Sequence, residues 1–239
     1  MNINIKNCEV NIIRERGTLE ISGTAEPKTE TRAAGIEGVI STQRTYTIAG
    51  FLANKAAVQV GDRVRLPAFT VPAVKIDGKK AMTFEELNIS DEAIVIDKEK
   101  DGKPILIFSH CLFESAMDLN DTNDFSQTQL AQYLAGEFKN AMNRAGIPAE
   151  DCGLVSKEDM FGKNRLEYFK DGRNLIAFDF DDDFTRWYWL ATLYDETASA
   201  SYFCYVSDYG LASYDSAHDT TGYVRPRFTM KMFDGKEDK

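Results

Sequence analysis

Histidine and cysteine are scarce in this sequence, and the few that occur are widely separated. The 239 residues contain two histidines, at positions 110 and 218, and four cysteines, Cys8, Cys111, Cys152 and Cys204. A zinc site needs Cys and His at short, regular spacings, and the sequence has no CxxC pair. We therefore expect no metal and no other cofactor, and we interpret the cysteines as buried free thiols of a reducing compartment.

Long apolar runs and an excess of basic residues are also missing. No stretch approaches the roughly 20 apolar residues of a membrane-spanning helix, so we expect no membrane insertion. Residues 1–9 alternate polar and apolar side chains and lack the apolar block of a signal peptide, which predicts cytoplasmic synthesis without the usual export route. A virion protein would also lack such a signal. The formal net charge of −10 argues against nucleic acid and against an anionic membrane surface as partners.

Motifs of catalysis or ion binding are not evident. The glycines at 35 and 38 do not fit the GxGxxG phosphate-binding pattern. His110 and Cys111 are neighbours, and neighbours on a strand point to opposite faces, so they should not form a nucleophile–base pair. Residues 179–183 offer several carboxylates, but they lack the glycine and closing glutamate of an EF-hand loop. We interpret them as an acidic surface turn.

The residues that are present predict an ordered protein rich in β-strands. Hydrophobic residues make up 43% of the chain, which is enough for a buried core in one large or two small domains. Two hairpins are predicted, one over residues 9–22 around a turn at Gly17, and one over residues 92–108 around Asp101-Gly102. Other expected features are strands at residues 45–52 and 63–66, turns at Gly61 and Gly78, and a long loop over residues 24–38.

One long amphipathic helix is predicted after residue 125. Ser126 and Gln129 match a capping box, in which the serine hydroxyl meets the backbone N–H three residues further on. Gly146 followed by Pro148 should end this helix. A shorter helix is expected to begin at Ser156. The buried stripe of the long helix consists of apolar residues at four-residue spacing, namely Leu130, Leu134, Phe138 and Met142.

Tyrosine is concentrated in the last third of the chain, where lysine is missing. Residues 187–228 contain seven of the ten tyrosines and no lysine. Strands are expected at residues 187–191 and 202–207, separated by loops rich in Ser, Asp, Thr and Gly. Because side chains alternate along a strand, Trp187 and Trp189 should share one face. Large aromatic residues in this arrangement are typical of core strands.

Several short motifs follow one another in a characteristic order. The second hairpin and the capped helix precede Leu154-Val155-Ser156-Lys157-Glu158, then Trp187-Tyr188-Trp189-Leu190, and finally a strand with the sequence Gly222-Tyr223-Val224-Arg225-Pro226-Arg227-Phe228. This order resembles a family of uncharacterised bacterial and phage domains with a C-type-lectin-like fold. The fold is similar to that of the formylglycine-generating enzyme and of the target proteins of diversity-generating retroelements. One departure is Ala191-Thr192, where Arg-Ser is usual.

The resemblance implies an α+β protein with twisted antiparallel sheets and one main helix. The C-type-lectin-like domain would span residues 55–232, after an N-terminal β-rich region at residues 1–54 and before a charged tail at residues 233–239. Arg225 is expected to be a buried or half-buried charge that is hydrogen-bonded to carbonyls or a carboxylate. The formylglycine-generating enzyme has paired cysteines near its C-terminal end, whereas only Cys204 lies there in this chain. Its oxidase chemistry is therefore not expected.

The loops between the aromatic strands are predicted to form a ligand-binding surface. Tyrosine offers a large, stiff contact with a hydrogen-bonding tip, and Ser, Gly and Asp adapt to a partner, which is the mixture that antibody paratopes use. Recognition also tends to lie on loops held by a rigid scaffold. The alternative is a solvated sheet edge with spare tyrosines. The residues predicted to bind are Tyr194, Asp195, Ser199, Ser201, Tyr202, Ser207, Asp208, Tyr209, Ser213, Tyr214, Asp215, His218 and Asp219.

We therefore expect a non-enzymatic ligand- or receptor-binding protein, such as a phage virion or bacterial surface-display component. Its partner would be a protein or a carbohydrate, and a homo-oligomer would add weak contacts through avidity. Two alternatives stay open. One is an enzyme or enzyme remnant related to the formylglycine-generating group. The other is a structural or assembly subunit whose Tyr-rich face is an interface.

Overall fold

The computed structural model describes residues 11–15, 18–22, 43–54, 56–182, 184–194 and 202–231. The chain divides into two compact units, Met1–Thr42 and Gln43–Lys239. In the first unit, β1 (Asn11–Glu15) and β2 (Thr18–Ser22) pair antiparallel, with Glu15 opposite Thr18. This pairing confirms the first predicted hairpin. The loop predicted over residues 24–38 and the tail at residues 233–239 lie outside the described residues.

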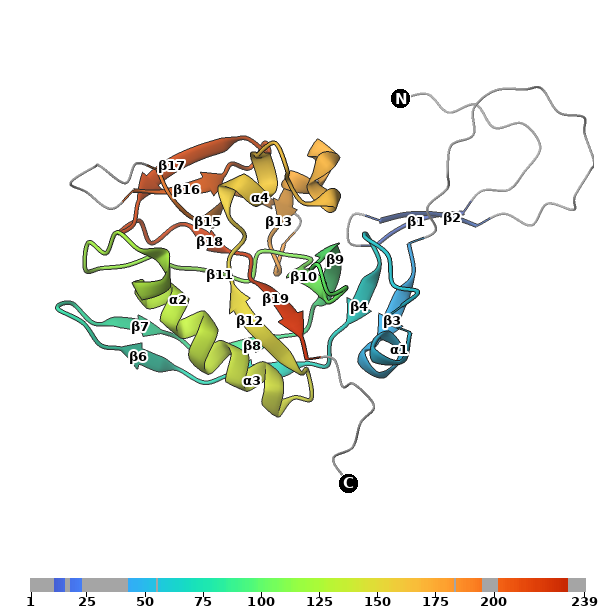
Figure 1. Cartoon of the computed structure of the whole chain (residues 1–239), viewed down its shortest axis with the longest axis horizontal. Helices are drawn as coiled ribbons and strands as arrows, with labels where there is room; N and C mark the ends of the chain where they lie inside the picture. Colours follow the sequence, from blue (N-terminus) through green and yellow to red (C-terminus); the bar gives the residue numbers. More distant parts are fainter. Residues whose placement is uncertain are drawn as a thin grey trace, which may run out of the picture. The chain divides into compact units, whose positions relative to one another are not determined.

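Two sheets organise the second unit, and most of their neighbouring strands run antiparallel (Figure 1). The six-stranded sheet has the order β12 (Ala149–Gly153), β19 (Arg227–Met230), β10 (Pro104–Phe108), β9 (Glu92–Lys98), β4 (Arg63–Arg65) and β3 (Thr45–Thr47). The five-stranded sheet has the order β11 (Phe113–Glu114), β18 (Tyr223–Val224), β15 (Tyr188–Leu193), β16 (Tyr202–Val206) and β17 (Ala212–Ser216). With one main helix beside these strands, the class is α+β, as predicted.

Three two-stranded ladders complete the strands of this unit. They are β5 (Phe69–Val71) with β8 (Leu87–Ile89), β6 (Val74–Ile76) with β7 (Met82–Phe84), and β13 (Ala177–Phe178) with β14 (Thr185–Arg186). The predicted turn at Gly78 joins β6 to β7, and the predicted hairpin around Asp101-Gly102 joins β9 to β10. Gly102 and Gly61 both have positive φ, at 85° and 89°, which glycine adopts without strain.

The expectation of one strand over residues 45–52 is wrong in its second half. The strand β3 covers only Thr45–Thr47, and α1 (Ile48–Ala53) follows at once. The physical reason is a helix cap, because the Thr47 side chain accepts a hydrogen bond from the Gly50 backbone N–H at 3.1 Å. The helix then buries Phe51 completely. Since β3 pairs with β4, residues 45–47 belong to the larger sheet.

The main helix has the predicted apolar stripe but a different beginning. It consists of α2 (Gln129–Tyr133), a π-helical turn (Leu134–Phe138) and α3 (Lys139–Arg144). Its N-cap is Thr128, whose hydroxyl accepts from the Ala131 N–H at 3.2 Å. Ser126 instead lies in a 3₁₀ turn (Phe125–Gln127) capped by Asp124. The four stripe residues, Leu130, Leu134, Phe138 and Met142, are all 0% exposed.

The second predicted helix is confirmed together with its cap. The helix α4 (Lys157–Phe161) begins after Ser156, and Ser156 and Asp159 form a reciprocal capping box. Two short 3₁₀ turns, Glu167–Lys170 and Gly172–Leu175, follow. None of the helices in the described part of the chain is long and apolar enough to cross a membrane.

The motif at residues 222–228 is two strands rather than the single strand predicted. The first strand, β18, belongs to the five-stranded sheet and β19 belongs to the six-stranded sheet. Pro226 lies between them, and a proline has no N–H with which to continue a ladder. Its carbonyl accepts a hydrogen bond from the Phe108 N–H at 3.0 Å. The chain therefore crosses from one sheet to the other at Arg225-Pro226.

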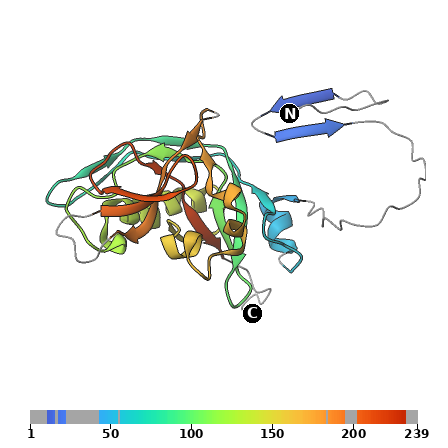
Figure 2. The same cartoon turned by 90° about the horizontal axis from the view of Figure 1, so that it is seen from above.

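Both faces of the central strands are buried, and the core forms two clusters. In β15, Trp189 belongs to the first cluster and Tyr188 to the second. Trp187 packs against the first cluster, with its ring 4.9 Å from that of Trp189. This arrangement confirms that the two tryptophans share a face. The main helix packs in the first cluster, and β16 and β17 lie at the opposite end of the unit from α1 (Figures 1 and 2).

Candidate recognition surface

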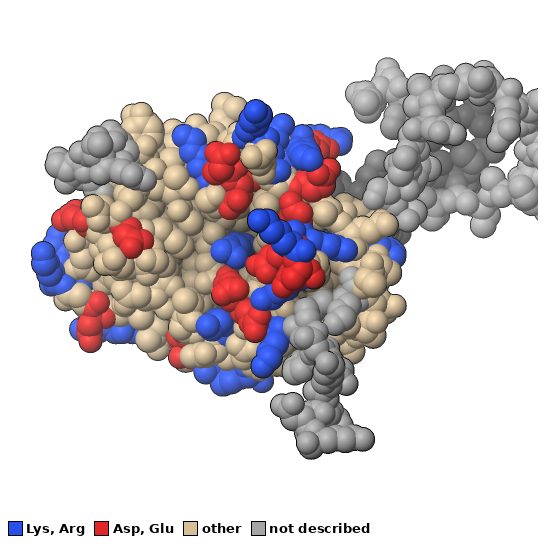
Figure 3. Space-filling view, in the orientation of Figure 1, with Lys and Arg blue, Asp and Glu red and all other residues tan. Residues whose placement is uncertain are grey.

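The predicted binding residues come from β16 and β17 and from the chain just after β15, β16 and β17. Asp195, Ser199 and Ser201 lie outside the described residues. Of the remaining ones, all but Ser213 and Asp215 fall into three groups at different places around the five-stranded sheet. Figure 3 shows that charged side chains gather over β9, β10 and β12, while the area over α2, β16 and β17 is largely uncharged.

The first group is a cluster of three exposed tyrosines. Tyr194 stacks on Tyr214, with ring centroids 3.6 Å apart and an interplanar angle of 21°. Tyr202 meets Tyr214 edge to face at 6.1 Å. The three residues nevertheless stay partly exposed, Tyr194 by 49%, Tyr202 by 37% and Tyr214 by 45%. We call these three residues the tyrosine cluster.

Strand register explains why these three residues meet. Tyr214 lies opposite Cys204 and Ser216 lies opposite Tyr202, so Tyr202 and Tyr214 are diagonal neighbours on one face. The backbone N–H of Tyr194 donates to the Tyr202 carbonyl at 2.8 Å, which places Tyr194 beside them. The same register puts Ser213 and Asp215 on the other face, opposite Tyr205 and Phe203. The structure therefore does not join Ser213 and Asp215 to the tyrosine cluster.

The second group lies at the turn between β16 and β17. Tyr209 is 79% exposed and Leu211 is 66% exposed. The Ser207 hydroxyl accepts from the Leu211 N–H at 3.1 Å and so closes the turn. This turn lies at the other end of β16 from Tyr202, a span of about 13 Å at a rise of about 3.3 Å per residue. Ser207, Asp208 and Tyr209 are thus separate from the tyrosine cluster.

The third group, His218 and Asp219, follows β17 and stabilises the local chain. An oxygen of Asp219 accepts from both the backbone N–H and the hydroxyl of Thr221 at 2.7 Å. His218 Nε2 lies 3.1 Å from a carboxylate oxygen of Asp121. These polar groups are already engaged within the chain.

A buried aromatic layer supports the sheet that carries the tyrosine cluster. Trp187 packs on Tyr205 at 4.7 Å, and the indole N–H of Trp189 donates to the Ser115 carbonyl at 2.8 Å. Arg225 is 3% exposed, as predicted. It donates to the carbonyls of Phe108 at 2.9 Å and Ser109 at 3.3 Å. These contacts give the exposed tyrosines a fixed base.

The acidic turn is exposed at Asp181 and Asp182, as expected of a surface turn, but Asp179 is buried. Asp179 is only 8% exposed and binds Arg186 at 2.8 Å, while Asp182 binds the same guanidinium at 2.7 Å. Burial raises the pKa of the Asp179 carboxyl, but hydrogen bonds from the Asp181 N–H, Arg186 and Tyr223 outweigh burial and leave that pKa below its ordinary value. Two of these carboxylates are therefore held by an arginine.

The three described cysteines are buried free thiols, as predicted for them. Burial raises the pKa of the Cys111 and Cys152 thiols to about 12. The imidazole of His110 binds Asp91 at 2.7 Å, while the Cys111 side chain packs in the second core cluster. Across the described ranges, no three His, Cys, Asp or Glu residues are grouped so that they could hold a metal ion. Cys8 lies outside the described residues.

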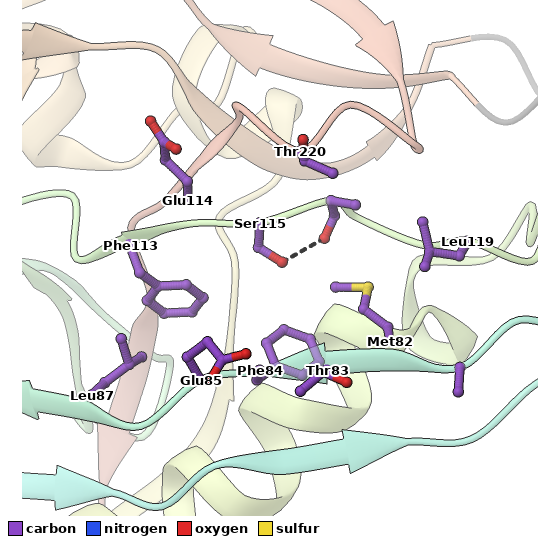
Figure 4. A pocket seen from close by; sticks show the side chains of 12 residues that line it. Met82, Thr83, Phe84, Glu85, Leu87, Phe113, Glu114, Ser115, Leu119 and Thr220 are labelled. Atoms are coloured by element: carbon purple, nitrogen blue, oxygen red, sulfur yellow. Dashed lines mark hydrogen bonds between the residues drawn. The ribbon is translucent and has the colours of Figure 1, made fainter.

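Sequence reasoning missed a groove on the side of the first core cluster. It has a volume of about 320 Å³ and lies between residues 81–87 and residues 113–119, with Thr220 near one end (Figure 4). Phe84 and Phe113 form much of its apolar wall. The two main segments are about 30 residues apart in the sequence, so no local pattern could indicate the groove.

No family model, curated protein or solved structure matches this chain. Fold class alone does not define a function, so function has to be argued from the chemistry of the sites.

Proposed function

We propose that this protein is a non-enzymatic ligand-binding protein with a C-type-lectin-like fold, and that the tyrosine cluster is its principal contact surface. The ligand is a protein or a carbohydrate, and the context is a phage virion or a bacterial surface-display assembly. The observation that carries this proposal is the packing of three tyrosines against one another on the outside of a rigid sheet.

Exposed tyrosines in mutual contact favour binding for a physical reason. Tyr194 and Tyr214 are held by stacking, so little side-chain entropy is lost when a partner covers them. Tyrosine contributes apolar area and a hydroxyl in one side chain, and it is enriched among the residues that dominate binding energies.

The arrangement of the scaffold supports the same proposal. Tyr194 directly follows β15, Tyr202 begins β16 and Tyr214 lies within β17. These strands are fixed from below by Trp187, Trp189 and Tyr205. Binding residues held in place by a rigid scaffold are the arrangement expected for recognition domains. The described cysteines are buried and unpaired, which favours binding over an oxidase related to the formylglycine-generating enzyme.

The test is a binding screen of the full chain against a glycan array and a panel of bacterial surface proteins. A hit is then measured with a Tyr194→Ser/Tyr202→Ser/Tyr214→Ser variant. The matched control is Phe184→Ser, because Phe184 is 68% exposed on the β13–β14 hairpin. We expect the triple variant to lose about tenfold or more in affinity, while the control keeps its affinity.

Two results would count against the proposal. A ligand that binds the triple variant as tightly as the parent would place recognition elsewhere. An oligomer that dissociates in the triple variant, with no ligand found, would instead make the tyrosine cluster a subunit interface. Size-exclusion chromatography of both proteins at several concentrations separates these outcomes.

A further inference from the structure

The groove between residues 81–87 and 113–119 is separate from the tyrosine cluster, because none of the three tyrosines lines it. Its apolar wall consists of Met82, Phe84, Leu87, Phe113 and Leu119. Figure 4 shows these side chains on β7, at the start of β8 and on the chain from Phe113 to Leu119, around the space between these segments. At about 320 Å³, the groove falls at the lower end of the range for small-molecule sites.

The aromatic wall of the groove is fixed from behind by the main helix. Phe84 is stacked on Tyr133, with ring centroids 4.0 Å apart and an interplanar angle of 1°. Phe113 meets the same ring edge to face at 5.8 Å. Tyr133 is 0% exposed, so neither wall residue has to rearrange to receive a ligand, and preorganisation of this kind favours binding.

The segment on the other side of the groove is held by backbone bonds. The Ser115 N–H donates to the Gly222 carbonyl at 2.8 Å, and the Met117 N–H donates to the Ala217 carbonyl at 2.9 Å. The Ser115 carbonyl accepts from Trp189. Both sides of the groove are therefore part of the folded core.

The charges at the groove are all of one sign. Among the residues that line it, Glu85 and Glu114 are charged and none is Lys, Arg or His. Both glutamates are exposed. Figure 4 shows the Glu114 carboxylate directed away from the Phe113 ring, and it is hydrogen-bonded with the Tyr223 side chain. Glu85 is therefore the carboxylate more available to a ligand.

We propose that this groove binds a small organic ammonium ion with an apolar body. The apolar wall would cover the hydrocarbon part, and Glu85 would pair with the ammonium group at the rim. A carboxylate ligand of the same shape would face two glutamates with no basic partner.

Three probes of the same length and different charge test this proposal: hexylammonium, hexanol and hexanoate. Binding to the full chain is measured by ligand-observed NMR, and the affected protein signals locate the site. We expect hexylammonium to bind about fivefold more tightly than hexanol, because a solvent-exposed ion pair contributes about that much to affinity. Hexanoate should bind more weakly than both. Equal affinity of hexanoate and hexylammonium, or no binding of any probe, would overturn the proposal.

Variants show whether Glu85 is responsible. Glu85→Gln should remove the preference for hexylammonium over hexanol and leave hexanol binding unchanged. Glu86→Gln is the matched control, since Glu86 is exposed in the same segment but does not line the groove, and it should keep the preference. Leu119→Trp should reduce binding of all probes by filling the groove that Leu119 lines, with circular dichroism as a check on folding. An unchanged preference in Glu85→Gln would contradict the assignment.

Discussion

Gly222 lies directly against the indole ring of Trp189. A Cβ atom at position 222 would be 2.1 Å from Trp189 Nε1 and 2.8 Å from the ring of Trp187. The contact is reinforced through Ser115, whose N–H donates to the Gly222 carbonyl and whose carbonyl accepts from the indole, each at 2.8 Å. The glycine of the 222–228 motif and the tryptophans of the 187–190 motif therefore depend on each other.

Gly222→Ala should destabilise the second unit by about 1–3 kcal/mol, because an added methyl would overpack a fully buried site. The measurement is urea unfolding monitored by tryptophan fluorescence. Gly136→Ala is the control, since a Cβ there meets nothing within 4 Å. Alanine should be neutral or stabilising by up to about 1 kcal/mol in that helical segment. Equal midpoints for Gly222→Ala and the parent would show that Trp189 has room to move.

Thr128 should be the cap on which the main helix depends. Its side chain is buried and bonds both the Ala131 N–H at 3.2 Å and the Phe125 carbonyl at 2.8 Å. Thr128→Ala should therefore cost about 1–2 kcal/mol. Ser126 is exposed and bonds only its near neighbour Asp124, so Ser126→Ala should cost less than about 0.5 kcal/mol. The measurement is thermal unfolding of both variants. A larger loss of stability in Ser126→Ala than in Thr128→Ala would show that Ser126 is the cap.

Thr128 and Ser126 also show why the exact start of the main helix could not be predicted from the sequence. A local pattern is sufficient when the whole motif is local, as with the capping box of Ser156 and Asp159 or the turn at Asp101-Gly102. For the main helix, two hydroxyls two residues apart could each serve as N-cap. The choice follows from the burial of Thr128 in the core, which no local pattern contains.

The candidate sites depend on contacts between distant residues, and this limited their prediction. The sequence indicated exposed tyrosines, but only the pairing of β16 with β17 shows that Tyr214 shares a face with Tyr202 and that Asp215 does not. Asp179 was expected at the surface, because its partner Arg186 and its burial become evident only in the folded hairpin.

The Asp179–Arg186 pair should make stability depend on pH. The pKa of Asp179 is lowered in the folded state, and the ordinary value is about 3.9. Its carboxylate therefore stabilises the fold above about pH 4, and this contribution is lost as the pH falls through the lowered pKa. Asp179→Asn should cost about 1–3 kcal/mol at pH 7, and the difference from the parent should shrink below pH 4.

Urea unfolding of the parent and of Asp179→Asn at pH 7 and at pH 3 measures this change. The control is Asp182→Asn, which removes the other carboxylate on Arg186. The side chain of Asp182 is 38% exposed, so its loss should cost less than about 1 kcal/mol. A difference between Asp179→Asn and the parent that is as large at pH 3 as at pH 7 would mean that the ion pair contributes nothing.

The described thiols should differ in reactivity in the folded protein. A rise of the thiol pKa from 9.0 to about 12 for Cys111 and Cys152 leaves roughly a thousandfold less thiolate at pH 8, and only the thiolate attacks an alkylating reagent. Burial also raises the pKa of Cys204, but less than it raises that of the other two thiols, so Cys204 should react faster than they do. Iodoacetamide labelling at pH 8, followed by peptide mass spectrometry with and without urea, assigns a rate to each cysteine. Labelling of Cys111 in the folded chain as fast as in urea would show that the second core cluster opens readily, because a thiol that stays packed there cannot ionise.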